Sequence, residues 1–301
     1  MIDKIVRNAK NNIIEPKFKI VEKLDYFRVL SNNGLQNITS SEFKKLKNDI
    51  KTFFNLSIAL SNDISTINLF RIRKNEKNDK SQIVKFKKIT DLIGPKKEDT
   101  TIQRANMKGE SVFYAALDMS TAISETRPET GDTITLSEWR LRKDKTLRNT
   151  FIFHPDKINI NSDSQKAFIG YLKSIKNLNK DLEEIYKELL SFIAEEFMKP
   201  VEEDINYLFS SLFSSNILQK GKDANDYQIE SITYPSVKGN GKVTNIAILN
   251  SLILEKLELI SVKTMKIIET NYEGKPKKSL INSLMTETKK FNFDENKIYW
   301  D

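Results

Sequence analysis

The chain has 301 residues and a formal charge of +8, from 49 basic and 41 acidic side chains. It contains no cysteine and a single histidine, His154, which excludes disulfides, thiolate metal sites, a cysteine nucleophile and a histidine-rich zinc site. No window of eighteen apolar residues occurs, and the first residues lack the apolar centre of a signal peptide, so we expect a cytoplasmic protein with one elaborated domain.

Residues 1–62 carry helical patterns. Thr39 with Glu42 predicts a capping box, and apolar residues follow at helical spacing from Phe43 to Phe54. We interpret this segment as a packing element without chemistry of its own.

An extended run begins at Ser65. The alternation of a strand places Arg71 and Arg73 on one side of it and Phe70 and Ile72 on the other. A second extended run is expected over residues 82–88, before a turn at Gly94-Pro95 and a polar loop.

The stretch from Arg104 to Glu125 predicts a loop, a strand and a short helix. Val112–Leu117 is apolar and partly aromatic, as in a buried strand. Asp118 or Ser120 is suited to cap a helix that Pro128 limits.

Three polar side chains fall within this stretch. Arg104 precedes the strand, Tyr114 lies in it, and Glu125 is expected on the first turns of the helix. Residue types alone favour an ordinary interpretation, in which Tyr114 is a core residue and Glu125 is a solvated carboxylate.

The remaining chain alternates between strand and helix patterns. Two strands are expected over residues 133–142 and 146–155, and His154, just before Pro155, is expected to be structural. Helices are expected between about residues 164 and 219, with Gly221 as a stop signal. Two further extended runs follow, 227–236 and 242–249, joined by a turn at residues 239–241. After position 250 we expect a strand or two and a last helix over residues 277–290.

Arginine is unevenly distributed. Lysine supplies 40 of the positive charges and is spread along the chain, whereas seven of the nine arginines lie between positions 71 and 148. Because the planar guanidinium grips phosphate through two hydrogen bonds, this segment is where we expect an anionic ligand. The overall positive charge does not by itself indicate nucleic acid, and no aromatic-basic ribonucleoprotein pattern occurs.

Three segments together resemble the RES domain, a family named for an Arg, a Glu and a Ser. They are RANMKG, VFYAALDMSTAISETRP and ITYPSVKGNGKVTNIAIL. The family Arg falls on Arg104, the Tyr on Tyr114, the Glu on Glu125 and the Ser on Ser236. LFRIR resembles the family's opening Arg-bearing strand, whereas the expected double proline near Lys97 is missing.

The resemblance covers about residues 66–250 and implies an α+β fold similar to ADP-ribosyltransferases, with a split, mostly antiparallel β core and flanking helices. The domain organisation expected from it is an N-terminal helical extension (1–64), a catalytic domain (65–250) and a C-terminal elaboration (251–301). Members are bacterial toxins that consume NAD or transfer its ADP-ribose, and each is neutralised by a cognate Xre-type antitoxin.

The resemblance also assigns roles to individual residues. Arg104, with Arg71 or Arg73, is expected to hold phosphate or ribose oxygens of NAD, and Tyr114 to stack on the nicotinamide ring. Glu125 is expected to stabilise the positive charge that develops at the anomeric carbon. Ser236 is expected to position ribose, phosphate or the Glu125 carboxylate.

Several alternatives stay open. NAD is expected as the substrate and no metal is expected, but hydrolysis and mono-ADP-ribosylation of a protein target are both compatible with the residues. A ribonuclease or RNA-binding toxin is less favoured because the chain offers few acid and base pairs, and specific nucleic-acid binding is not expected. A non-catalytic interaction module is the third class, and a homodimer is not excluded by the sequence.

Overall fold

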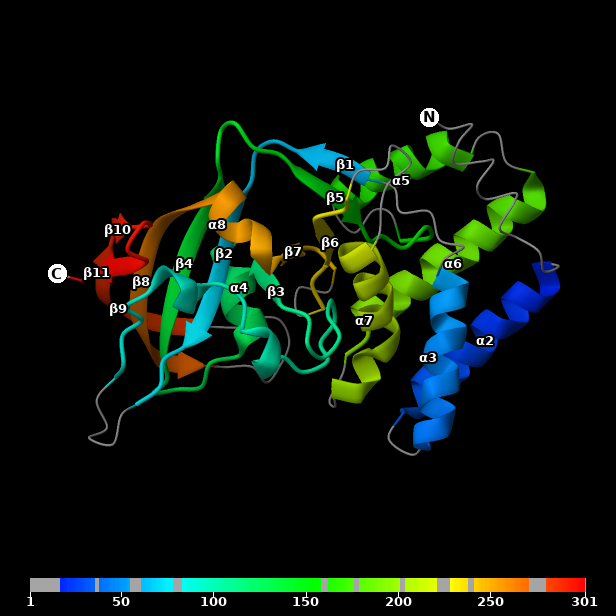
Figure 1. Ribbon diagram of the computed structural model, residues 1–301, viewed down its shortest axis with the longest axis horizontal. Helices are drawn as coiled ribbons and strands as arrows, with labels where there is room; N and C mark the ends of the chain where they lie inside the picture. The colour runs from blue at the N-terminus through cyan, green and yellow to red at the C-terminus, as the bar shows by residue number, and fades with distance from the viewer. Residues whose placement is uncertain are drawn as a thin grey trace. The chain divides into compact units, whose positions relative to one another are not determined.

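The computed structural model describes residues 17–35, 38–54, 61–77, 83–157, 162–175, 179–200, 204–220, 228–237, 241–270 and 280–300. Figure 1 follows its helices and strands along the chain. Gly221, Gly239 and Asn240, which the sequence assigns to a helix stop and a turn, lie outside the described residues.

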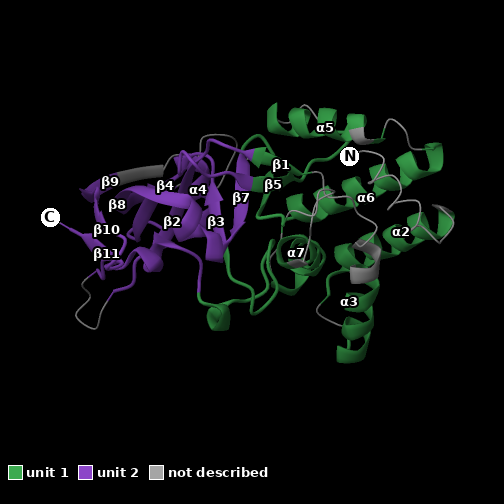
Figure 2. Ribbon diagram, turned by 45° about the horizontal axis from the view of Figure 1, so that its top comes forward, with its two compact units in different colours: residues 1–63, 96–112, 148–243 green, residues 64–95, 113–147, 244–301 purple. Residues whose placement is uncertain are grey.

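The chain divides into two compact units, each assembled from three separate segments (Figure 2). Unit 1 consists of Met1–Asp63, Lys96–Val112 and Arg148–Val243, and unit 2 consists of Ile64–Pro95, Phe113–Leu147 and Thr244–Asp301. The N-terminal helices therefore share a unit with part of the expected catalytic segment.

Unit 1 is mainly helical in its described residues. Its helices are α2 (Lys17–Asn33), α3 (Ser40–Phe54), α5 (Ser162–Ile175), α6 (Lys180–Met198) and α7 (Leu208–Ser215), with 3₁₀ turns at Lys97–Asp99 and Asp204–Tyr207 and a π-helical turn at Asn216–Lys220. Its strands are β1 (Ser61–Ile64), β5 (Leu147–Phe151) and β6 (Ser231–Pro235), in the order β1-β5-β6, and β5 pairs with β6 in parallel. Strands β1 and β5 each include one residue at a unit boundary.

The capping signals in unit 1 explain where its helices begin. The predicted capping box before α3 is confirmed, since the backbone N–H of Glu42 donates to Thr39 Oγ1 at 3.3 Å and that of Thr39 donates to Glu42 Oε2 at 2.8 Å. Helix α6 begins after Asn179, whose Oδ1 accepts from the backbone N–H of Leu182 at 2.9 Å.

Helix α2 packs along α6. The rings of Phe27 on α2 and Phe192 on α6 are both buried, with centroids 6.2 Å apart. Beside them Arg28 donates to Glu188 and Glu195 of α6, each at 3.1 Å. Apolar burial and a bidentate arginine therefore fix the N-terminal helix to the longest helix of the unit.

Unit 2 contains most of the strands. They are β2 (Asn68–Lys74), β3 (Val112–Ala116), β4 (Thr133–Leu141), β7 (Thr244–Leu249), β8 (Leu257–Thr270) and β9 (Leu280–Thr288), with a separate hairpin of β10 (Lys290–Asn292) and β11 (Lys297–Tyr299). Its helices are α4 (Met119–Thr126) and α8 (Ile253–Lys256), with 3₁₀ turns at Ile89–Leu92 and Asn250–Leu252. The strand order is β7-β3-β2-β4-β8-β9.

Strand pairing is mostly antiparallel. Antiparallel pairs join β2 to β3 and β4, β4 to β8, and β8 to β9. The predicted mixture of helices with a mostly antiparallel β core is confirmed at this level.

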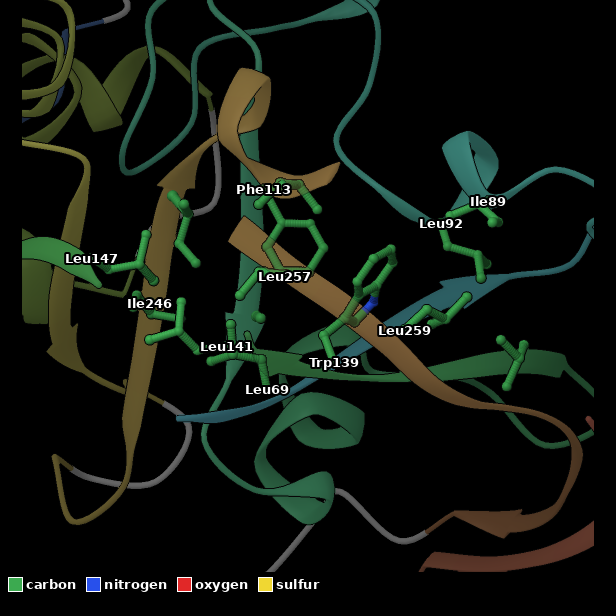
Figure 3. Packing of buried hydrophobic residues seen from close by; sticks show 14 of the residues in the cluster. Leu69, Ile89, Leu92, Phe113, Trp139, Leu141, Leu147, Ile246, Leu257 and Leu259 are labelled. Carbon is green, nitrogen blue, oxygen red and sulfur yellow. The ribbon is translucent and has the colours of Figure 1, made fainter. Parts of the chain in front are cut away.

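Two apolar clusters cover the two faces of this sheet. The first contains Phe113 of β3 and Trp139 of β4, whose rings meet edge to face at 5.7 Å, together with the 3₁₀ turn Ile89–Leu92 (Figure 3). The second contains Ala116 of β3 and Ala122 of α4. Because successive residues of a strand point to opposite faces, α4 lies on the face away from Phe113 and Trp139.

One predicted element is wrong, and another is formed only in part. The expected last helix over residues 277–290 is strand β9 where it is described, paired with β8 over most of its length. Its apolar residues suit either period, and the long partner strand decides the outcome. The second extended run, expected over residues 82–88, forms no regular strand in the described residues 83–88, where Ile83 makes an isolated bridge with Lys77.

Candidate active site

Helix α4 carries Glu125 on its last turn. Of the two expected caps, Asp118 is the one used: its carboxylate accepts from the backbone N–H of Thr121 at 2.8 Å and from Thr121 Oγ1 at 2.5 Å. Burial acts to raise the pKa of Asp118, but hydrogen bonds from Thr121 and Ser120 outweigh it and hold that pKa below its usual value.

The expectation that Glu125 falls on the first turns is wrong. Helix α4 begins at Met119 and ends at Thr126, and Arg127 follows in the left-handed conformation with φ of 45°. Glu125 is therefore beside the C-terminal end of the helix, and its side chain is exposed.

The Glu125 carboxylate is held by a strand residue. The side-chain Nδ2 of Asn245, on β7, donates to Glu125 Oε1 at 2.9 Å. Asn245 is itself buried, and the backbone N–H of Leu117 donates to the carbonyl of Thr244 at 3.2 Å. This backbone bond brings the start of β7 to the end of β3, directly before α4.

Tyr114 lies on the α4 face of the sheet. It shares the alternation of β3 with Ala116, which packs beside Ala122 of α4, and it is half-buried. On β7, Ile246 and Ile248 belong to the cluster on the other face, so Asn245 also points to the α4 side. Tyr114, Asn245 and Glu125 thus share one face.

Arg71 approaches the same strand from the opposite face. Its guanidinium carbon lies 5.4 Å from the centroid of the Phe113 ring, and Nη1 donates to the carbonyl of Tyr114 at 2.7 Å. Its buried Nε finds no hydrogen-bond partner within the part of the chain that the structure describes. Burial, and then the neighbouring charge of Arg73, lower the pKa of Arg71 to about 10, whereas Tyr114 acts in the other direction.

Arg73 is engaged by a different segment. Its Nη1 donates to the carbonyl of Asp91, and its guanidinium carbon lies 5.0 Å from the centroid of the Phe86 ring. Arg71 and Arg73 were predicted to lie on one side of the strand. This placement is confirmed, because the contacts of both side chains lie on the Phe113 face.

Arg104 belongs to unit 1, where it caps α6. It donates to the carbonyls of Glu196 and Lys199, each at 3.2 Å, and to that of Phe197. Its guanidinium carbon also lies 4.9 Å from the centroid of the Tyr207 ring. These carbonyls end a helix and lack intrahelical donors, so the arginine fork satisfies them.

Ser236 also belongs to unit 1 and is fully buried. Its backbone N–H donates to the carbonyl of Val243, and its carbonyl accepts from the N–H of Gly241, both at 2.8 Å. Gly241 has a φ of 74°, a conformation that favours glycine and lets the chain turn back after β6.

The predicted residues therefore fall into two sets. Tyr114 and Glu125 lie on one face of the unit 2 sheet, with Arg71 and Arg73 on its other face. Arg104 and Ser236 are described within unit 1, and their roles stay predictions. Asn245 was not among the predicted site residues, although a polar amide inside the apolar run of β7 was a signal for it.

The structure also bears on three other expectations, which concern His154, metal ions and membrane spans. His154 is buried, its Nδ1 accepts from the backbone N–H of Asp156 at 3.1 Å, and its Nε2 lies 3.7 Å from Glu195 Oε1. Among the described residues, no group of three or more acidic or histidine side chains is arranged to hold a metal ion. Within the same residues, no helix has the length and apolar character to span a membrane.

No protein-family model matches the chain, and no curated protein matches it in sequence. The resemblance to the RES domain therefore depends on the ordered motifs around Arg104, Glu125 and Ser236.

Proposed function

We propose that the protein is a RES-type enzyme with an ADP-ribosyltransferase-like fold that cleaves NAD at the bond between nicotinamide and ribose. The observation that carries this proposal is the Glu125 carboxylate, held by the Asn245 amide on the face of the sheet that also presents Tyr114. An exposed carboxylate fixed by a buried neutral amide is suited to a substrate that develops positive charge.

The chemistry follows from the bond that breaks. The electron pair of the C–N bond leaves with nicotinamide, which becomes neutral, and the ribose acquires oxocarbenium character at its anomeric carbon. Glu125 stabilises that charge, as carboxylates do in glycoside hydrolysis. Water then adds to the anomeric carbon and loses a proton, which gives ADP-ribose. A nucleophile of a protein target would give ADP-ribosylated protein instead.

Tyr114 is the candidate for binding the leaving group. Its half-buried ring lies on the Glu125 face, and the nicotinamide of NAD is flat and positively charged. Stacking of this ring on an aromatic face is electrostatically favourable, and the attraction is lost when cleavage neutralises the nicotinamide.

The arginines differ in their partners. Arg28, Arg140 and Arg148 each pair with a carboxylate, at 2.8 to 3.1 Å. In contrast, Arg71, Arg73 and Arg104 form no ion pair with any carboxylate of the described residues, and each instead contacts an aromatic ring and backbone carbonyls. Arg71 and Arg73 lie on the face of the sheet opposite to Glu125, and Arg104 belongs to unit 1, so the phosphate-binding role expected of these arginines stays a prediction.

The short pairing between β2 and β3 supports the proposed fold. Phe70 pairs with Ala116, and next to this pair the side chain of Arg71 donates to the Tyr114 carbonyl. The proposed split of the β core would fall at this short ladder.

One experiment tests the activity and separates its two forms. The purified chain is incubated with NAD labelled in the adenylate half, with and without cell lysate, and free nicotinamide and protein-bound label are measured. Nicotinamide release without bound label supports hydrolysis, and bound label supports transfer. Intact NAD under both conditions contradicts the proposal.

The proposed partner is a Xre-type antitoxin. The basic charge of the chain would accelerate association with an acidic segment of such a protein. Copurification with the product of the adjacent open reading frame should give a complex in which NAD cleavage is suppressed. A product that does not bind, or binds without inhibiting, contradicts this part of the proposal and leaves the enzymology intact.

A further inference from the structure

Asn245 occupies a position where stability alone favours an apolar residue. Its neighbours Thr244, Ile246, Ala247 and Ile248 are all buried, and asparagine is depleted in strands. A buried amide is costly unless its hydrogen bonds are made, and the Nδ2 of Asn245 donates to the Glu125 carboxylate.

Glu125 is also unfavourable for the stability of helix α4 at its position. It is the penultimate residue of α4, and the C-terminal end of a helix carries partial negative charge. A carboxylate is therefore disfavoured there relative to a neutral or basic residue. Two locally unfavourable residues are matched to each other across α4 and β7, which is typical of a functional position rather than of a stabilising one.

We propose that Asn245 is the positioning residue for Glu125, an inference that rests on the proposed NAD cleavage. Through its Nδ2, Asn245 fixes the position of Oε1 and removes rotameric freedom from a long, exposed side chain. The amide is neutral, so it orients the carboxylate without cancelling the negative charge that the transition state requires.

The proposal predicts different effects on kcat and on KM when Asn245 is replaced. Charge at the anomeric carbon develops only in the transition state, so a misplaced Glu125 should lower kcat and leave KM nearly unchanged. We expect kcat of Asn245→Ala to fall on the order of 10- to 100-fold, as for loss of a hydrogen bond to a charged group.

Asn245→Asp separates hydrogen bonding from shape. Aspartate has nearly the size of asparagine but no N–H to donate, and when ionised it repels Glu125. If the role of Asn245 were only to fill space on β7, Asn245→Asp would retain activity. We expect it to lose at least as much kcat as Asn245→Ala.

The decisive experiment is a double-mutant cycle of Asn245→Ala with Glu125→Gln, measured by nicotinamide release and by melting temperature. Asn250→Ala is the matched control, because it also replaces an asparagine of unit 2, whose side chain accepts from the backbone N–H of Gly94 at 2.8 Å. If Asn245 acts through Glu125, Asn245→Ala should cost less than about threefold in the Glu125→Gln background, although it costs far more alone. The control should change melting temperature without changing kcat.

The outcomes are distinguishable. Additive losses in the cycle, or wild-type kcat in both Asn245 variants, overturn the role of Asn245 and leave the proposed function standing. Failure of the wild-type chain to release nicotinamide overturns the proposed function, and this inference with it.

Discussion

Arg71 donates through Nη1 to the backbone carbonyl of Tyr114 at 2.7 Å, so a side chain of β2 bonds to the backbone of β3 next to the pair of Phe70 and Ala116. The same guanidinium has a buried Nε without a partner in the described chain. An incompletely satisfied, buried cation is costly, and binding of an anion would offset that cost.

Replacing Arg71 by methionine should separate stability from binding. Arg71→Met removes a buried charge and also one hydrogen bond worth about 0.5 to 1.5 kcal/mol, so we expect the unfolding free energy to change by less than about 1 kcal/mol. NAD affinity, measured by calorimetry, should fall about tenfold or more. Arg140→Met, which breaks the exposed pair with Glu258, is the control and should leave NAD affinity unchanged. Unchanged affinity in Arg71→Met would remove Arg71 from the binding site.

Arg104→Lys should weaken the end of α6. Lysine keeps the charge but cannot satisfy the carbonyls of Glu196, Phe197 and Lys199 with one planar fork. We expect the unfolding free energy to fall by about 1 to 3 kcal/mol, with faster hydrogen exchange in the last turn of α6. NAD turnover on the same preparation should also fall if Arg104 contacts the ligand. Lower stability with normal turnover would assign Arg104 a purely structural role.

Glu125→Gln isolates the charge of the carboxylate. Glutamine is nearly isosteric and its side-chain oxygen can still accept from Asn245, but it cannot offset a cationic transition state. We expect nicotinamide release to fall on the order of 100-fold with little change in melting temperature, because the side chain is exposed. Glu255→Gln, at an exposed position of helix α8, should behave like the wild type. Retained turnover in Glu125→Gln would contradict the mechanism.

Glu196 should make the stability of the protein pH-dependent. Burial raises the pKa of its carboxyl above the ordinary value of 4.5, although a hydrogen bond from Ser31 and the charge of Lys199 act to lower it. The folded chain therefore holds this proton to a higher pH than the unfolded chain does, and the contribution of Glu196 to the unfolding free energy falls as pH rises above 4.5. Relative to Glu196→Gln, the wild type should lose stability over that range and then level off.

Urea unfolding at intervals from about pH 4 to about pH 8 measures the difference in unfolding free energy between the wild type and Glu196→Gln. Glu42 provides a control of opposite sign, because hydrogen bonds from Thr39 lower the pKa of its carboxyl. The contribution of Glu42 is present above its ordinary pKa and is lost as pH falls. A pH-independent difference between the wild type and Glu196→Gln would show that the Glu196 carboxyl titrates normally.

Local signals made part of this structure predictable. The capping box at Thr39 and the cap at Asp118 depend on side chains within three residues of the bonds they make, so the sequence contains all the information needed. Strand β2 was predictable for the same reason, since alternation alone separates Arg71 from Ile72.

Features that depend on distant partners were not predictable. Strand β9 was expected to be helical because its apolar spacing suits both periods, and only its pairing with β8 decides. The bond between Asn245 and Glu125 joins residues 120 positions apart, and the capping of α6 by Arg104 spans more than 90. The spacing of apolar residues gives no information about contacts between distant residues. Glu125 could therefore be predicted from the sequence, whereas Asn245, which holds its carboxylate, could not.

The interleaving of the two units has a consequence for synthesis of the protein. Unit 2 takes β2 from residues 68–74 and β8 from residues 257–270, so its sheet cannot close until nearly the whole described chain has left the ribosome. In unit 1, likewise, β5 cannot pair with its parallel neighbour β6 until residues 231–235 have been synthesised. Nascent chains would therefore remain without a completed Glu125 face during translation, since Asn245 is made long after Glu125.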